Sequence, residues 1–398
     1  MKVIHLLPYF APAWEFGGVV RAAYGLTRAL VRAGHAVTVL TTDASLTGQP
    51  FDREEVLDGV RVRRAHNVLP GLRRLNLSSP LALPGLLRTE LAQADVLHLH
   101  EFRTVEALMG LSAARRWQVP VVLSPHGTLG YGAGRTRIKQ GWDALFGAWS
   151  AARVSCVAAL TADEAAEVRD LWGRFGVPLP DARLQVVPNG VDLAEFRGLP
   201  DGAVFRSRWQ IPSTASLILF LGRLHRRKGV HHLIDALVTL QDAWLAVVGP
   251  DEGELAALQA QAQALGVAGR LVFTGLLDGQ EKMSAFTAAD VLALPAVGEG
   301  LPMVLLEAMA AGLPVAISDE CHLPEAIDAG AGVRLPVLEG AAIAEAIRPV
   351  LADEALRQKM RVRAARLVAE RFTWDAVAEQ MAALYRQVAE EERRNARN

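Results

Sequence analysis

Short apolar runs rich in β-branched residues alternate with amphipathic stretches through the first half of the chain. Residues 2–7 are typical of a buried strand. Apolar residues three or four positions apart then predict a helix that begins after Gly17-Gly18 and ends near Ala33, before Gly34. Further strands are predicted at residues 37–40, 96–99 and 121–123. Strands that alternate with helices in this way predict a parallel sheet with helices on both faces.

The same alternation begins again after Pro188-Asn189-Gly190, a turn sequence that is typical of a hinge. The second series predicts strands at residues 217–221, 244–248, 271–274, 291–294 and 315–317, with helices at 229–240, 254–265, 280–288 and 303–311. We therefore expect an α/β protein of two Rossmann-like, doubly wound domains, residues 1–186 and 187–372, that face a central cleft. A helical pattern in residues 373–398 predicts a last helix that packs back on the first domain.

Composition narrows the class of protein. Of the 398 residues, 51% are hydrophobic and 21% are charged, which is enough apolar material for two cores. The formal net charge of -1 provides no strong field, so we expect no nucleic-acid partner. The two cysteines, Cys156 and Cys321, predict neither a disulfide framework nor a metal site. Without a signal-peptide pattern or an apolar stretch of about 18–20 residues, we expect a cytoplasmic protein whose membrane contact is at most peripheral.

Two glutamates separated by seven residues are the strongest chemical signal. Glu299 lies in the loop after a predicted strand, and Glu307 lies in the helix that follows, where Pro302 suits the first turn. The N-terminus of that helix supplies free N–H groups to phosphate or sugar hydroxyls. Glu299 can bind a sugar and Glu307 a ribose diol. The same spacing is equally typical of an acidic residue near a helix start and a surface glutamate.

A basic loop, residues 222–229, follows the first predicted strand of the second domain. Arg223, as a planar fork, and Lys228, as a point charge, can both bind a diphosphate. Basic clusters are usually solvated, but a position at the carboxyl end of a strand favours a ligand site.

Three weaker signals lie in the first domain. His126 follows the predicted strand 121–123, and Gly17-Gly18 follow the first strand, where the backbone can approach a phosphate. His98 and His100 alternate at a strand end. We find no third metal ligand at a suitable spacing, so packing or cleft lining is the favoured interpretation of this pair.

An amphipathic stripe in residues 142–149 includes Trp142, Leu145, Phe146 and Trp149, and the basic residues Arg135, Arg137 and Lys139 precede it. The stripe is suited to a membrane surface, but core packing is the favoured interpretation.

As an ordered set, these signals resemble the large family of retaining glycosyltransferases with the GT-B fold known as family 4. The resemblance covers most of the chain, from the glycine pair to the Glu-x7-Glu element, and includes Pro-Asn-Gly-Val-Asp at residues 188–192. It implies transfer of a hexose-type sugar from a nucleoside-diphosphate sugar to a hydroxyl of a glycan or lipid-linked acceptor, in bacterial polysaccharide or glycoconjugate synthesis. It also implies that neither a metal nor another cofactor is needed.

The resemblance implies roles for the phosphate-binding and sugar-binding residues. Gly17 and Gly18 approach the donor phosphates, and His126 lies beside the transferred sugar. Arg223 and Lys228 bind the pyrophosphate and stabilise its departure, with Arg227 as a further candidate. The acceptor hydroxyl then attacks the face from which the diphosphate leaves, so that anomeric configuration is retained.

The remaining implied contacts come from the second domain. The backbone of Leu277 contacts the base, and Glu307 holds the ribose. Glu299 contacts the sugar, together with amides of Gly300, Leu301 and Met303. Many members of the family have glycines and an aromatic residue where this chain has Leu301 and Pro302, and Pro302 has no N–H to donate.

Two other functions fit the predicted architecture. A sugar-nucleotide epimerase needs acid–base carboxylates and histidines around the sugar, in a pattern that the sequence lacks. A non-catalytic sugar-nucleotide-binding subunit would be favoured by loss of Arg223, Lys228 or Glu307, and all three are present. Acceptor contacts are expected from residues 66–79 and 130–139.

Overall fold

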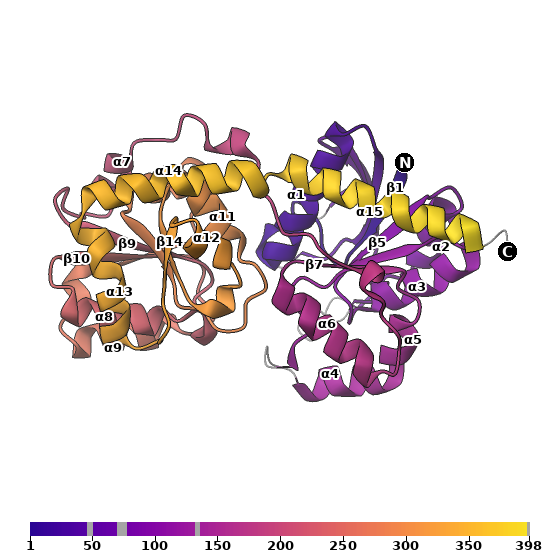
Figure 1. Ribbon diagram of the computed structural model, residues 1–398, viewed down its shortest axis with the longest axis horizontal. Coiled ribbons are helices and arrows are strands. Elements are labelled where there is room, and N and C mark those ends of the chain that lie inside the picture. The colour runs from indigo at the N-terminus through magenta and orange to yellow at the C-terminus, as the bar shows by residue number, and fades with distance from the viewer. Residues whose placement is uncertain (46–50, 70–77, 132–135, 396–398) are drawn as a thin grey trace. The chain divides into compact units, whose positions relative to one another are not determined.

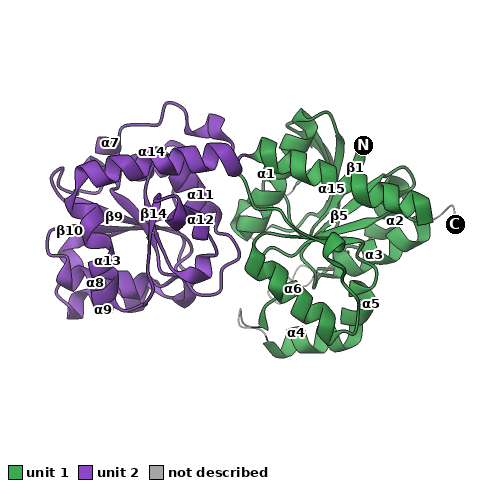
Figure 2. Ribbon diagram, viewed as in Figure 1, with its two compact units in different colours: residues 1–190, 374–398 green, residues 191–373 purple. Residues whose placement is uncertain are grey.

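The computed structural model describes residues 1–45, 51–69, 78–131 and 136–395, and the chain forms two compact units. Unit 1 comprises Met1–Gly190 together with Trp374–Asn398, and unit 2 comprises Val191–Thr373 (Figure 2). The units divide a few residues after the boundary expected at 186. The last helix, α15 (Trp374–Asn395), lies in unit 1 and packs beside α1 (Gly18–Arg32) (Figure 1).

Within the described residues, unit 1 contains an eight-stranded sheet of order β3-β4-β2-β1-β5-β6-β7-β8. β3 pairs with β4 in antiparallel fashion, and the pairs from β4 to β8 are parallel. The strands are β1 (Lys2–Leu6), β2 (Ala36–Thr42), β3 (Glu54–Leu57), β4 (Val60–Ala65), β5 (Val96–His100), β6 (Val121–Ser124), β7 (Cys156–Ala159) and β8 (Leu184–Val186). The other helices are α2 (Leu83–Leu91), α3 (Val105–Trp117), α4 (Thr136–Trp142), α5 (Ala148–Ala151) and α6 (Ala162–Arg174), with a π-helical turn at Asp143–Gly147.

The two central strands of unit 1 have chemically different faces, because successive side chains of a strand point to opposite sides. Leucine and isoleucine side chains of β1 and β5 pack with α2 and α3 in one apolar core. The opposite face carries three fully buried histidines, His5, His98 and His100, and His5 is paired with His98 in register. Tyr385 of α15 contacts this polar face through His98. The returning helix therefore completes the environment of these histidines.

The contact between α1 and α15 depends on the small size of Gly25. A Cβ atom at this position would lie 2.2 Å from the indole of Trp374, which is buried. The close approach of the two helices thus requires glycine.

We expect Gly25→Ala to destabilise the protein by about 1–3 kcal/mol, because the added methyl forces the indole or the helix to move. Gly85→Ala is the matched control: Gly85 lies in α2, and an added Cβ would meet no atom within 4 Å. The control should keep or slightly raise stability, since alanine is the better helix former. Urea unfolding of both variants checks this, and equal stabilities would contradict the described packing of α15.

Unit 2 contains, over its described residues, a six-stranded parallel sheet of order β11-β10-β9-β12-β13-β14. Its strands are β9 (Ser216–Leu221), β10 (Ala243–Val248), β11 (Leu271–Gly275), β12 (Val291–Leu294), β13 (Val315–Ile317) and β14 (Gly332–Arg334). Its helices are α7 (Gly202–Arg208), α8 (Val230–Thr239), α9 (Leu255–Ala264), α10 (Gly279–Ala288), α11 (Met303–Ala310), α12 (Pro324–Asp328), α13 (Gly340–Ala352) and α14 (Glu354–Arg371). Both sheets are doubly wound α/β sheets, as predicted.

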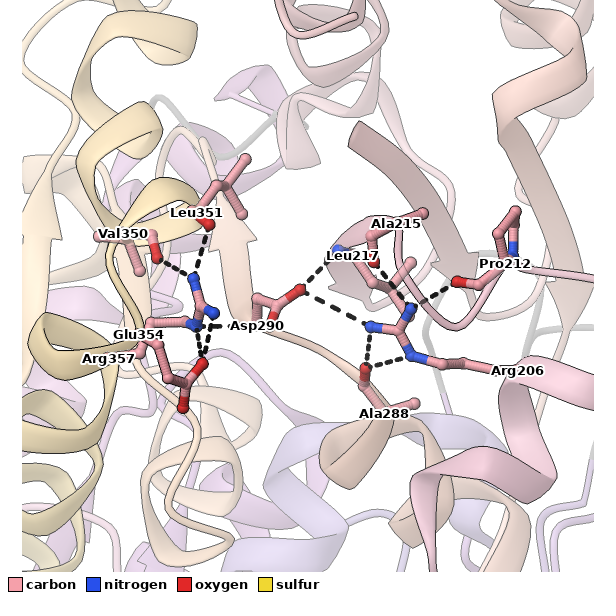
Figure 3. Close-up of polar contacts among 10 residues, drawn as sticks. All are labelled: Arg206, Pro212, Ala215, Leu217, Ala288, Asp290, Val350, Leu351, Glu354 and Arg357. Carbon is pink, nitrogen blue, oxygen red and sulfur yellow. Dashed lines mark hydrogen bonds and ion pairs between the residues drawn. The ribbon is translucent and has the colours of Figure 1, made fainter. Parts of the chain in front are cut away.

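A polar cluster around Asp290 ties helices to the amino ends of the central strands of unit 2. Figure 3 shows Asp290 between the guanidinium groups of Arg206 and Arg357, at N–O distances of 3.6 and 3.5 Å. Its carboxylate also accepts the N–H of Leu217 at 2.8 Å. Both arginines donate to backbone carbonyls, Arg206 to that of Ala288 among others. This cluster stabilises unit 2 at the amino ends of its central strands, opposite to the loops that follow their carboxyl ends.

Candidate active site

The predicted residues of the second domain meet where the strand order of its sheet reverses. β9 and β12 are neighbours, and the strands that follow each of them lie further out on opposite sides. Ligands of doubly wound sheets bind beyond the carboxyl ends of strands at such a switch point. Lys228 follows β9 and Glu299 follows β12, and the Lys228 Nζ–Glu299 Oε2 distance is 2.8 Å. Their side chains are only 17% and 13% exposed, so this ion pair marks the switch point with two largely buried opposite charges.

The loop that carries Lys228 is fixed by its backbone. A 3₁₀ turn spans Arg226–Lys228, and Gly229 follows with a φ of +76°. A Cβ atom at Gly229 would lie 2.0 Å from the carbonyl oxygen of Pro295, just after β12. The N–H of Val297 also donates to the carbonyl of Arg227 at 2.8 Å. The loops after β9 and β12 are therefore packed against each other.

The two arginines of the basic loop differ in their surroundings. Arg223 is half exposed, and its Nη1 lies 2.5 Å from Glu252 Oε1. Arg227 has a buried Nη1 that lacks a hydrogen-bond partner within the described part of the chain. A buried guanidinium nitrogen without a partner is costly, and it is suited to donate to an anion. Arg227, the further candidate of the sequence prediction, thus has the stronger structural signal.

The second glutamate is held in an ion pair that the sequence did not predict. Glu307 lies in α11, and its Oε2 is 2.7 Å from Lys282 Nζ of α10, with both side chains 13% exposed. It is therefore not the surface residue of the alternative interpretation. Pro302 directly precedes α11 instead of lying in its first turn, and Leu301 and Leu277 are buried.

In unit 1, the glycine pair and His126 also follow central strands. Gly17 precedes α1 without a side-chain cap, and a Cβ at Gly17 or Gly18 would meet no atom within 4 Å. Helix N-terminal amides left without a cap are suited to an anion. His126 has a φ of +57°, and the following N–H, of Gly127, donates to the carboxylate of buried Glu164. Glu164 therefore holds the backbone that presents His126.

Four histidines meet at the carboxyl ends of β1, β5 and β6. His100 Nδ1 lies 2.8 Å from His126 Nε2, and His100 Nε2 lies 2.9 Å from His5 Nδ1. His98 contacts Tyr385 Oη at 2.6 Å and Ser124 Oγ at 2.9 Å. Burial lowers the pKa of His5 to about 3 and that of His126 to about 4, and it also lowers the pKa values of the other two. All four imidazoles are therefore neutral at pH 7.

Comparison with known proteins identifies the family. The model described as Glycosyltransferase Family 4 matches residues 16–195, and the model described as Glycosyl transferases group 1 matches residues 203–394. The D-inositol 3-phosphate glycosyltransferase of Xylanimonas cellulosilytica is 31% identical over 97% of this chain and 96% of its own. The chain belongs to glycosyltransferase family 4.

Solved structures confirm the fold of this glycosyltransferase. Sucrose-phosphate synthase from Thermosynechococcus elongatus aligns with a TM-score of 0.78 and 22% identity, over 97% of this chain and 98% of that chain. HepE from Anabaena, solved in complex with UDP and glucose, aligns with a TM-score of 0.75 and 21% identity, over 96% and 98% of the two chains. These structures confirm the predicted GT-B architecture. The predicted class of enzyme, a glycosyltransferase, is confirmed by the family.

The prediction for His98 and His100 was incomplete. A third histidine, His5, does lie beside them, and one nitrogen from each ring falls within 4.8 Å of the others. It escaped the sequence analysis because it lies on a different strand, far away in the chain. The parallel pairing of β1 with β5 brings it close. The available sequence signal was a histidine among the apolar residues of a strand that was predicted to be buried.

Glu101 is a further residue of the glycosyltransferase that the sequence analysis missed. It directly follows β5 with a φ of +69°, a conformation that is rare for glutamate. Burial, together with the nearby charge of Glu106, raises the pKa of Glu101 to about 7. Such combinations gather at functional sites, but no sequence motif marks this position.

The favoured interpretation of the amphipathic stripe was wrong. Leu145 is 74% exposed, and Phe146 and Trp149 are each 37% exposed, because the segment lies at the surface of unit 1. Arg135 falls outside the described residues, as do 132–134 of the second expected acceptor loop and 70–77 of the first. Among the described helices of the enzyme, none is long and apolar enough to cross a bilayer.

Proposed function

We propose that the enzyme is a retaining, metal-independent glycosyltransferase that moves a hexose-type sugar from a nucleoside-diphosphate sugar to a hydroxyl of a glycan or lipid-linked acceptor. The proposal includes a place in bacterial polysaccharide or glycoconjugate synthesis at the cytoplasmic face of the membrane. The observation that carries it is the Lys228–Glu299 ion pair at the switch point of unit 2, beside the unpaired nitrogen of Arg227.

The diphosphate is the ligand that best fits the basic loop. Lys228, Arg223 and Arg227 supply positive charge where negative charge grows as the sugar–phosphate bond breaks. In the proposal, Lys228 turns from Glu299 to the diphosphate when the donor binds, which leaves the Glu299 carboxylate to accept hydroxyls of the sugar. The cationic side chains take the place of a metal ion in balancing the phosphate charge.

The other donor contacts follow from the same arrangement. Glu307 accepts the ribose hydroxyls and Lys282 orients its carboxylate, while the backbone of Leu277 contacts the base. Amides of Gly300, Leu301 and Met303 contact the sugar at the start of α11. Gly17, Gly18 and His126 of unit 1 act on the phosphates and the transferred sugar.

A nucleoside diphosphate should bind without a metal and stabilise the protein. At 100 times the dissociation constant, the expected stabilisation is ~2.7 kcal/mol. Thermal shift with UDP, GDP and ADP, each in EDTA, measures it. Arg227→Ala should lose most of the shift, whereas Arg226→Ala should keep it, because Arg226 is exposed in the same turn. No shift with any nucleotide, or a shift that needs magnesium, would contradict the proposal.

The exposed stripe favours peripheral binding to an anionic lipid surface. Arg153 lies over the Trp149 ring at 4.1 Å, and the charge of Arg115 contributes to lowering the pKa of Arg153 after the larger effect of burial. Two cations close to exposed aromatic and aliphatic side chains match an anionic membrane, in which apolar residues insert while basic residues meet headgroups.

Leu145→Glu should reduce sedimentation with vesicles of phosphatidylglycerol and phosphatidylcholine several-fold, because it places a charge where an apolar side chain inserts. Val362→Glu is the control, since Val362 is 60% exposed but lies on α14 of unit 2. Vesicle binding that is unchanged in Leu145→Glu, or lost equally in both variants, would count against this surface.

A further inference from the structure

Three imidazoles of unit 1 form an unbroken hydrogen-bonded row, His5–His100–His126. We propose that His5 and His100 are positioning residues that fix the tautomer of His126, so that its Nδ1 carries the proton and donates a hydrogen bond to an oxygen of the donor substrate. The substrate part of this inference rests on the proposed function, whereas the tautomer does not.

No other side chain among the described residues competes for the ring nitrogens that form the two hydrogen bonds of the row. His100 uses both ring nitrogens within the row. His5 uses one ring nitrogen, at 2.9 Å from His100, and His126 uses one, at 2.8 Å from His100. The neighbouring His98 is occupied by Tyr385 and Ser124, so it does not interrupt the row. His5 and His100 are buried, and His126 is partly buried. The hydrogen bonds are therefore shielded from exchange with solvent.

Proton counting leaves only two arrangements. A neutral imidazole has one N–H, so His100 can donate through one nitrogen only and must accept through the other. In the first arrangement, His126 donates to His100 and His100 donates to His5, so His126 Nδ1 carries no proton. In the second arrangement, His5 donates to His100 and His100 donates to His126, so His126 must carry its proton on Nδ1. The end of the row at His5 thus determines the chemistry available at His126.

The environment of His5 selects between these arrangements. His5 Nε2 is buried and has no hydrogen-bond partner among the residues described. The first arrangement would place an N–H donor there, and most buried side-chain donors have a hydrogen-bond partner. The second leaves only a lone pair at that nitrogen. It is therefore preferred, and His126 Nδ1, which has no partner in the described chain, becomes a donor.

This assignment gives His126 a definite chemical role. With its Nε2 accepting from His100 and its pKa near 4, the ring does not collect a proton at neutral pH. It acts as a fixed neutral donor to a sugar hydroxyl or phosphate oxygen instead of a general base. Fixed donors directed at developing charge contribute to catalysis without reorganisation.

Nitrogen NMR of the whole protein, labelled with ¹⁵N-histidine, tests the tautomer without any ligand. The His126 signals are assigned by their loss in His126→Gln. We expect a protonated Nδ1 and a bare Nε2 in the intact protein, and a mixture of tautomers in His100→Phe. His100→Asn should restore the protonated Nδ1, because its amide can donate from a similar position. The main result is the tautomer of His126 in the native protein, so the test remains valid if a variant does not fold.

Three results would overturn the proposal: a protonated Nε2 on native His126, a doubly protonated ring at pH 7, or a stoichiometric transition metal bound to His5, His98 and His100 in metal analysis. Activity separates this inference from the proposed function. If the native tautomer is as expected but no nucleotide sugar is turned over, the proposed function fails and the tautomer assignment stands. If the enzyme is active, His100→Phe should lower kcat at least tenfold and leave UDP, GDP or ADP binding unchanged.

Discussion

Lys228→Ala is expected to lower kcat by about 10²–10³-fold, the typical loss when one preorganised group that stabilises the transition state is removed. Lys228 is largely buried beside Glu299 at the switch point of unit 2, and in our account it faces charge that grows as the diphosphate leaves. Glu299→Ala should also lose kcat but keep binding of the free nucleoside diphosphate. Steady-state kinetics, with calorimetric binding of the diphosphate, separates these effects.

Two variants serve as controls for the Lys228 result. Glu307→Gln should mainly raise the donor KM, because a residue that holds the ribose binds ground state and transition state alike. Arg226→Ala should leave both constants close to native, since its side chain is exposed in the same turn. Full turnover by Lys228→Ala, or loss of diphosphate binding instead of turnover in Glu299→Ala, would refute the assigned roles.

Acidification from pH 7 to 5 is expected to destabilise unit 1 by several kcal/mol. Burial lowers the pKa values of His5, His98, His100 and His126 well below 6.5, so these rings stay neutral in the folded protein while the unfolded chain binds protons. Their stabilising contribution is present above pH 6.5 and is lost as the pH falls towards the folded values. Each histidine costs roughly 1.4 kcal/mol per pH unit in this window.

Glu101 has the opposite effect on the pH dependence of stability. Its raised pKa of about 7 means that the folded protein holds a proton that the unfolded chain releases above about pH 4.5. Unfolding near pH 5.5 should therefore take up protons on balance, because the four histidines gain protons and Glu101 releases one. Urea unfolding at several pH values measures the slope. His126→Gln should reduce this slope by about one proton. A flat profile would contradict the neutral buried histidines.

The sequence predicted two strands of unit 2 well because they are fully buried runs of apolar residues. Val291–Leu294 and Val315–Ile317 were predicted with the bounds that the structure gives. The β3–β4 hairpin was not predicted, because charged residues interrupt its apolar pattern. There, Glu54 pairs with Arg61 across the two strands at 2.7 Å. Cross-strand charge pairs stabilise an edge hairpin without leaving an apolar signature.

The site could be predicted where a charged residue lies in a loop directly after a predicted strand, as Lys228 and Glu299 do. The partnership between them was not, because it depends on β9 and β12 being neighbours in the sheet. Lys282 and His5 were missed for the same reason: each meets its partners through tertiary contacts alone. The stripe in residues 142–149 was wrongly predicted to pack in the core. Helical periodicity locates an apolar face, but it does not show whether another part of the protein covers that face.

The central claim is that this family 4 enzyme releases a nucleoside diphosphate from a sugar nucleotide by means of Lys228 and without a metal. The most direct test incubates the native protein with UDP-, GDP- and ADP-sugars in EDTA and measures the free nucleoside diphosphate, with Lys228→Ala in parallel. We predict release from at least one donor by the native protein, and a rate that is about 10²–10³-fold lower in the variant. Release that requires a divalent metal, or equal rates for the native protein and Lys228→Ala, would contradict it.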